Sequence, residues 1–125
     1  MKELISPENG PPAVGPYSPA VHANGMVFVS GQIPIDPASG QMVTGSIEEQ
    51  VKRVLENVTI VLESCGSSLE KVVKVGVYLR DLGNFQAMNS VYESYFATSK
   101  PARSTVEVCR LPKEADVEID VIALE

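Results

Sequence analysis

The residues that could do chemistry lie near the end of the chain, where an arginine precedes a row of carboxylates. The stretch PARSTVEV, residues 101–108, places Arg103 at the start of an alternating segment. Further along, Glu118 and Asp120 alternate with apolar residues in VEIDVIAL. A guanidinium has a permanent charge and planar donors that fit a carboxylate in a two-pronged manner. This pattern indicates a site for a small carboxylate, although a surface arginine at a strand end remains the simpler alternative.

Composition limits the class of protein. The 125 residues are enough for one domain, which we expect to span residues 1–125. The chain has 10 basic and 16 acidic residues, a net charge of −6, and no basic stripe, which argues against nucleic acid as the main partner. It also lacks a long apolar run, so we expect no membrane span, no targeting peptide and a cytoplasmic location.

Metal-ligating residues are few. Cys65 and Cys109 lie in unrelated contexts without redox or metal-ligand spacing, and His22 is the single histidine. Both cysteines are typical of small apolar residues in a reducing compartment. We therefore expect no metal site.

The elements that must position these residues follow from periodicity and turn residues. Asn24-Gly25 suits a two-residue hairpin turn within residues 20–30, and Ser46 with Glu49 forms a capping box. Asn84 is the expected cap of a second helix, whose apolar stripe of Phe85, Met88, Tyr92, Tyr95 and Phe96 includes the polar Asn89. The Asn89 amide must find hydrogen bonds, either to backbone or in a ligand site. The expected strands are 2–6, the two arms of the hairpin, 71–80, 103–109 and 117–124, and the expected helices are 46–65 and 84–98.

This order predicts an α+β domain with a single mixed β-sheet and both helices on one face. In the last strand, one row of side chains is apolar and suits the face under the helices, whereas Glu118, Asp120, Ile122 and Leu124 form the opposite row. If strands 103–109 and 117–124 form a hairpin, Arg103 can share that second face. A face that mixes carboxylates with large aliphatic residues favours a subunit interface over a sheet surface that is partly wet.

Several stretches together resemble the Rid (reactive intermediate deaminase) family, also called RidA/YjgF. The similarity covers essentially the whole chain. The motifs that carry it are GPYSPA (15–20), VSGQIP (29–34), LENV (55–58), VYLRDLGNFQAMNSVYESYF (77–96), PARSTVEV (101–108) and RLPKEADVEIDVIA (110–123).

The resemblance implies a chorismate-mutase-like fold, assembled as a homotrimer with active sites in clefts between subunits. It implies a hydrolase, independent of any cofactor, that converts 2-iminobutanoate and 2-iminopropanoate to 2-oxo acids and ammonia. In that family the PAR arginine, here Arg103, binds the substrate carboxylate, and the VEI glutamate, here Glu118, directs water. Tyr17 completes the expected catalytic set, and the other expected substrate-binding residues are Ser30, Gly31, Asn89 and Thr105.

One departure concerns Thr105, because many family members have cysteine there. A hydroxyl still forms hydrogen bonds, so we retain the activity without any role for a thiol. Two other functions stay open at this point. One is a regulatory trimer that binds small carboxylates without turnover, and the other is a ribonuclease or translation inhibitor. Glu118 near Arg103 favours turnover, and the net charge of −6 disfavours the nuclease.

Overall fold

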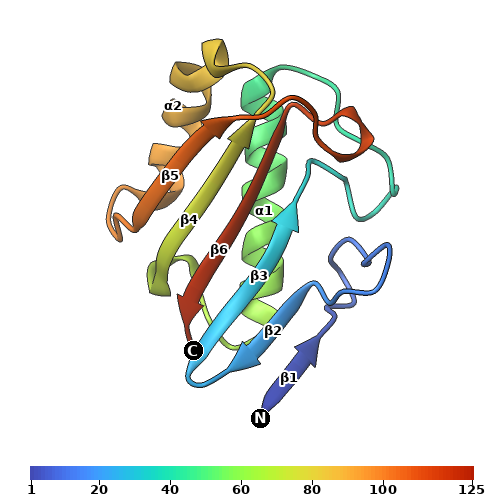
Figure 1. Cartoon of the computed structure of the whole chain (residues 1–125), viewed down its shortest axis with the longest axis vertical. Coiled ribbons are helices and arrows are strands. Elements are labelled where there is room, and N and C mark those ends of the chain that lie inside the picture. Colours follow the sequence, from blue (N-terminus) through green and yellow to red (C-terminus); the bar gives the residue numbers. More distant parts are fainter.

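The structure is a computed structural model that describes residues 1–125. Six strands form one mixed sheet in the order β1-β2-β3-β6-β4-β5, and two helices pack on one face of it (Figure 1). The strands are β1 (Lys2–Ile5), β2 (Ala20–Ala23), β3 (Met26–Gln32), β4 (Val72–Leu79), β5 (Ala102–Glu107) and β6 (Val117–Leu124); the helices are α1 (Ile47–Ser64) and α2 (Phe85–Phe96). The predicted α+β architecture and order of elements are confirmed.

Local signals explain most of the element ends. Asn24 and Gly25 have φ angles of 57° and 76°, as a tight hairpin turn between β2 and β3 requires. The Ser46 hydroxyl accepts a hydrogen bond from the Glu49 backbone N–H at 3.2 Å at the start of α1. Asn84 occupies the N-cap position of α2 as predicted, but its side chain forms no capping hydrogen bond. Instead, Asp81 accepts from the Gly83 N–H at 2.8 Å, because a 3₁₀ turn, Leu82–Asn84, leads into α2.

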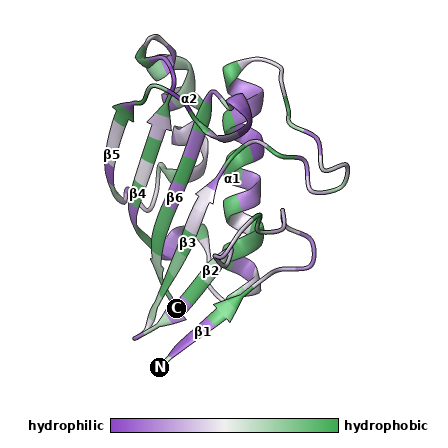
Figure 2. Cartoon of the chain, turned by 45° about the vertical axis from the view of Figure 1, so that its right-hand side comes forward, coloured by the Kyte–Doolittle hydropathy of each residue, from purple (hydrophilic) through white to green (hydrophobic).

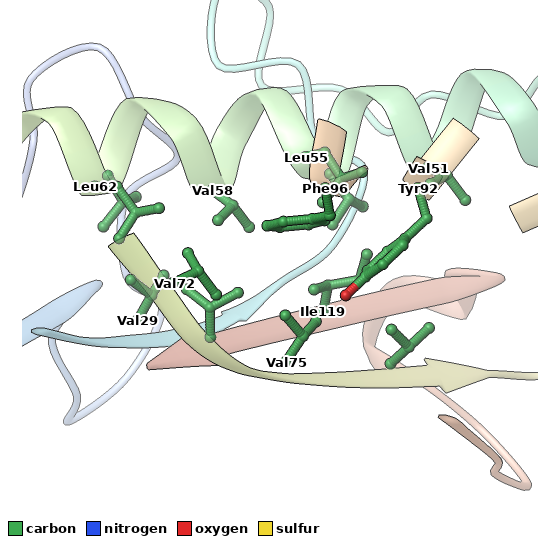
Figure 3. Packing of buried hydrophobic residues seen from close by; sticks show 14 of the residues in the cluster. Val29, Val51, Leu55, Val58, Leu62, Val72, Val75, Tyr92, Phe96 and Ile119 are labelled. Atoms are coloured by element: carbon green, nitrogen blue, oxygen red, sulfur yellow. The ribbon is translucent and has the colours of Figure 1, made fainter. Parts of the chain in front are cut away.

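The core lies between the helices and the sheet. Figure 3 shows side chains of α1 directed at the strands, with Tyr92 and Phe96 of α2 between the two layers. The side chains that α1 buries against the sheet are Val51, Val54, Leu55, Val58, Val61 and Leu62. Each large aliphatic side chain stabilises this packing by about 1.5–3 kcal/mol. We call that face of the sheet the helix face. Neither helix combines the length and apolar character needed to cross a membrane.

The pairing of the last strands differs from the predicted hairpin. β4 lies between β5 and β6, parallel to β5 and antiparallel to β6. The physical reason is α2, which connects β4 to β5 as a crossover between parallel strands. The expectation that Arg103 shares a face with Glu118 is therefore wrong for a single chain. Arg103 pairs with Val75, which is buried on the helix face, whereas Glu118 pairs with Tyr78 on the other face.

No helix covers the other face, which we call the open face. Figure 2 shows polar and apolar segments alternating along β6, as the sequence predicted. Large apolar side chains on this face remain exposed, including Phe28 at 40%, Val106 at 45% and Leu124 at 49%. Phe28 pairs with Ile122 in the neighbouring strand. The open face thus carries an apolar area beside the carboxylates of β6.

Candidate active site

Arg103 lies on β5, at the edge of the sheet, against one side of α2. Its Nη1 donates a hydrogen bond to Oδ1 of Asn89 at 2.7 Å. Its guanidinium carbon lies 4.5 Å from the ring centroid of Tyr92 and 5.5 Å from that of Phe85. The ion pairs of the chain join His22 to Glu125 and Arg80 to Asp116, so no carboxylate of this chain neutralises Arg103. A half-buried cation with an amide partner and no anion is suited to bind an anionic ligand.

A hollow of about 540 Å³ opens beside the guanidinium. Asn89 and Tyr92 line it from α2, and Lys100 and Pro101 line it from the turn before β5. Asn89 was expected either to tie down backbone or to reach a ligand site. Its amide oxygen instead binds Arg103, which places the side chain at the candidate site.

Glu118 lies on the open face of β6 at a second hollow of about 300 Å³. Burial raises the pKa of the Glu118 carboxyl, and the nearby Asp120 charge raises it further. A side chain at Gly31 would place its Cβ only 2.3 Å from Oε2 of Glu118. Glycine at position 31 is what allows the carboxylate to lie against β3.

Tyr17 lines the same hollow as Gly31 and Glu118. The Pro/Gly-rich loop that carries it is held to β3 by Ser30, whose hydroxyl donates to the Ser18 carbonyl at 2.7 Å and whose N–H donates to the Pro19 carbonyl at 2.9 Å. Ser30 therefore positions the loop, and Tyr17 remains half exposed at the edge of the hollow. The remaining walls are residues 11–14, Pro19, Gln32, Ile33, Ile35, Pro112 and Lys113.

Thr105 lines neither hollow. It pairs with Val77 and therefore lies on the helix face, two residues beyond Arg103. Its hydroxyl is buried and has no hydrogen-bond partner. The structure thus places the expected residues in two groups, with Arg103 and Asn89 in one and Tyr17, Ser30, Gly31 and Glu118 in the other. The sheet separates the two groups within one chain.

Two residues near these groups were missed from the sequence as parts of the site. Tyr92 was assigned only to the apolar stripe of α2, although its position three residues after Asn89 puts both on one side of that helix. Asp120 was seen only as part of a polar row. Its Oδ2 accepts a hydrogen bond from the Tyr78 hydroxyl at 3.0 Å, and its charge acts on Glu118.

Comparison with known proteins defines the family. The family model described as Endoribonuclease L-PSP matches residues 7–125. A solved structure from Yersinia pestis, described as a protein of unknown function of the conserved Rid protein family, aligns with a TM-score of 0.97 at 44% identity and covers 100% of both chains. The chain belongs to this family, the Rid (RidA/YjgF) family, as the sequence motifs predicted.

Two relatives show the range of names within the family. A RutC family protein of Pyrococcus horikoshii is 53% identical over 123 residues, which are 98% of this chain and 98% of that protein. A protein of the goat, Capra hircus, named 2-iminobutanoate/2-iminopropanoate deaminase, is 42% identical over 125 residues, covering 100% of this chain and 91% of that protein.

Proposed function

We propose that the protein hydrolyses small 2-imino acids, such as 2-iminobutanoate and 2-iminopropanoate, to 2-oxo acids and ammonia. The observation that carries the proposal is Arg103, a half-buried guanidinium that is bound to Asn89 and lies over the ring of Tyr92 without an anion of its own. A 2-imino acid supplies that anion as its carboxylate and presents the C=N carbon next to it. The goat relative at 42% identity, whose name states this activity, supports the same substrate class.

The proposed reaction needs only protein groups and water. Arg103 holds the carboxylate, and Glu118 takes a proton from the water whose oxygen bonds to the imine carbon. The protonated Glu118 returns this proton to the imine nitrogen, which gives a carbinolamine. Its hydroxyl then loses a proton to Glu118 and its nitrogen gains that proton, so that the C–N bond breaks, the C=O bond forms and ammonia leaves. A carboxylate with a raised pKa is a stronger base near neutral pH, which suits Glu118 to this role. Tyr17, at the edge of the same hollow, is suited to hydrogen-bond the departing nitrogen.

The proposed site is shared between subunits of a homotrimer. Arg103 and Glu118 lie on opposite faces of one sheet, so a second copy of the chain is needed to bring them together. The exposed Phe28, Val106 and Leu124 on the open face give such an assembly an apolar contact surface. A trimer of the 13.4 kDa chain would sediment at about 40 kDa.

The two other functions have less support. A regulatory trimer that only binds carboxylates would use Arg103 equally, but it would have no use for a glutamate with a raised pKa in a second hollow. Nuclease activity has to be considered again because the family model is described as an endoribonuclease. Against it, the net charge is −6, and the single histidine, His22, contacts Glu125 and lines neither of the two candidate hollows.

The direct test follows the formation of 2-oxo acid from freshly generated 2-iminobutanoate and 2-iminopropanoate, with and without the purified protein. We expect catalytic amounts of the protein to accelerate both reactions, because positioned water and one general base act on an already reactive bond. Binding of 2-oxobutanoate without any acceleration of imine loss would instead establish the regulatory trimer.

A further inference from the structure

The ring of Tyr92 lies directly beneath the cation of Arg103. The distance from the guanidinium carbon to the ring centroid is 4.5 Å, within the range of a cation–π contact. The Tyr92 side chain is only 8% exposed, so little water competes for that contact. The ring of Phe85 lies farther away, at 5.5 Å.

We propose that Tyr92 is a positioning residue, whose ring fixes the guanidinium of Arg103 so that its free donors face an incoming carboxylate. The chemical class of that ligand rests on the proposed function, whereas the contact between ring and guanidinium does not. The guanidinium carbon lies over the Tyr92 ring, and Nη1 donates to Asn89. These two contacts leave the other donors for a ligand.

The core holds the ring of Tyr92 in place. Its centroid lies 4.6 Å from that of Phe96, one turn later on α2, with an angle of 38° between the ring planes. Figure 3 shows the ring between α1 and the strands, with its hydroxyl directed toward the sheet. A side chain clamped between two layers has little rotational freedom, so it presents a fixed surface to Arg103.

The Tyr92 hydroxyl belongs to the same contact region, because Arg103 lowers the pKa of the phenol against the larger effect of burial. It is buried and forms no hydrogen bond of normal geometry, so the contact that the structure shows with the Arg103 guanidinium is made by the ring. Burial raises the pKa of Tyr92, although the Arg103 charge acts in the opposite direction, and the phenol remains neutral. A neutral ring orients the cation without cancelling its charge, which leaves that charge for the ligand.

The expected effect is therefore on binding. An arginine without this ring samples many rotamers in the free protein, and only a fraction of them presents the donors correctly. Tyr92→Leu should weaken binding of the product 2-oxobutanoate and of the substrate 2-iminobutanoate, so that Kd and KM each rise roughly 3- to 30-fold, the span of a desolvated cation–π contact. The kcat should change by less than about threefold, because the bound pose is the same once formed.

Two matched variants separate positioning from a general loss of packing. Tyr92→Phe keeps the ring and removes the unpartnered hydroxyl, so Kd and KM should stay at wild-type values. Tyr95→Leu makes the same substitution on the same helix. Tyr95 packs against the core, whereas the rings next to the Arg103 guanidinium are those of Phe85 and Tyr92. Tyr95→Leu should reduce stability without changing Kd or KM.

The mobility of the Arg103 side chain can be measured without a ligand, so this test does not depend on the proposed function. Side-chain ¹⁵N relaxation of the Arg103 Nε–H group, assigned by its loss in Arg103→Ala, should report greater mobility in Tyr92→Leu than in wild type, Tyr92→Phe or Tyr95→Leu. Unchanged Arg103 mobility and unchanged Kd in a folded Tyr92→Leu would overturn the inference. A wild-type protein that does not accelerate imine hydrolysis, together with increased mobility in Tyr92→Leu, would refute the proposed function and support the positioning role.

Discussion

Arg103→Lys is expected to lose nearly as much turnover of 2-iminobutanoate as Arg103→Ala. Lysine keeps the charge, but it lacks the planar donors that hold a carboxylate in two places, and its single ammonium cannot replace a guanidinium that contacts both the Tyr92 ring and Asn89. The imine carbon then drifts away from the attacking water. We expect kcat/KM to fall roughly 10²- to 10³-fold in Arg103→Ala and to within about fivefold of that value in Arg103→Lys.

The comparison depends on intact assembly, so both variants are first checked by sedimentation and by circular dichroism. Arg80→Ala is the matched control, because Arg80 is a more exposed arginine that pairs with Asp116 at 3.5 Å. That variant should retain wild-type kinetics. Wild-type turnover in Arg103→Lys would mean that charge alone, and not the geometry of the guanidinium, explains this residue.

Glu118→Gln should abolish turnover and stabilise the fold at neutral pH. Glutamine keeps the size of the side chain but cannot take a proton from water, and we expect kcat to fall roughly 10²-fold or more. Binding of 2-oxobutanoate should remain close to wild type. A wild-type rate in Glu118→Gln would remove Glu118 from the mechanism.

The stability effect follows from the direction of the pKa shift. The pKa of Glu118 is raised in the folded protein above its usual value of 4.5, so the folded state holds this proton more tightly than the unfolded chain. The resulting stabilisation is present below the unfolded pKa and is lost as the pH rises through the folded pKa. Urea unfolding should therefore show Glu118→Gln to be more stable than wild type at pH 7, with the difference vanishing in acid. A wild type that is the more stable of the two at pH 7 would contradict the shift.

The sequence predicted the elements well because each has a local cause. The stripe of α1, the Ser46 cap and the Asn24-Gly25 turn depend on residues only a few positions apart. Strand order does not have a local cause. After β5 the chain passes β4 and forms β6 on the other side of it. Only the complete sheet shows that β6 pairs with β3 and β4 and not with β5. The position of Asn84 at the start of α2 was predicted correctly, but its side chain forms no capping hydrogen bond, because a 3₁₀ turn capped by Asp81 leads into the helix.

The residues of the candidate site could be predicted from the sequence, but their arrangement in space could not. Family motifs identified Arg103, Glu118, Tyr17 and Asn89, and the structure places each of them at one of the two hollows. Their distribution over two faces follows from the parallel register Val75–Arg103 and the antiparallel register Tyr78–Glu118, which no local pattern reveals. Tyr92 was not predicted as a site residue for another reason. On an apolar stripe, a tyrosine that fills the core and a tyrosine that supports an arginine give the same sequence pattern.

The most direct test of a shared active site mixes two inactive chains. Arg103→Ala and Glu118→Gln chains are unfolded together in equal amounts, refolded, and assayed for 2-oxo acid formation from freshly generated 2-iminobutanoate. If each site takes Arg103 from one subunit and Glu118 from the next, about a quarter of the sites in random assemblies carry both residues, and about a quarter of the refolded wild-type rate should return. If the mixture stays as inactive as its two parents, while refolded wild type is active, the two residues do not meet across a subunit interface and the proposed site is wrong.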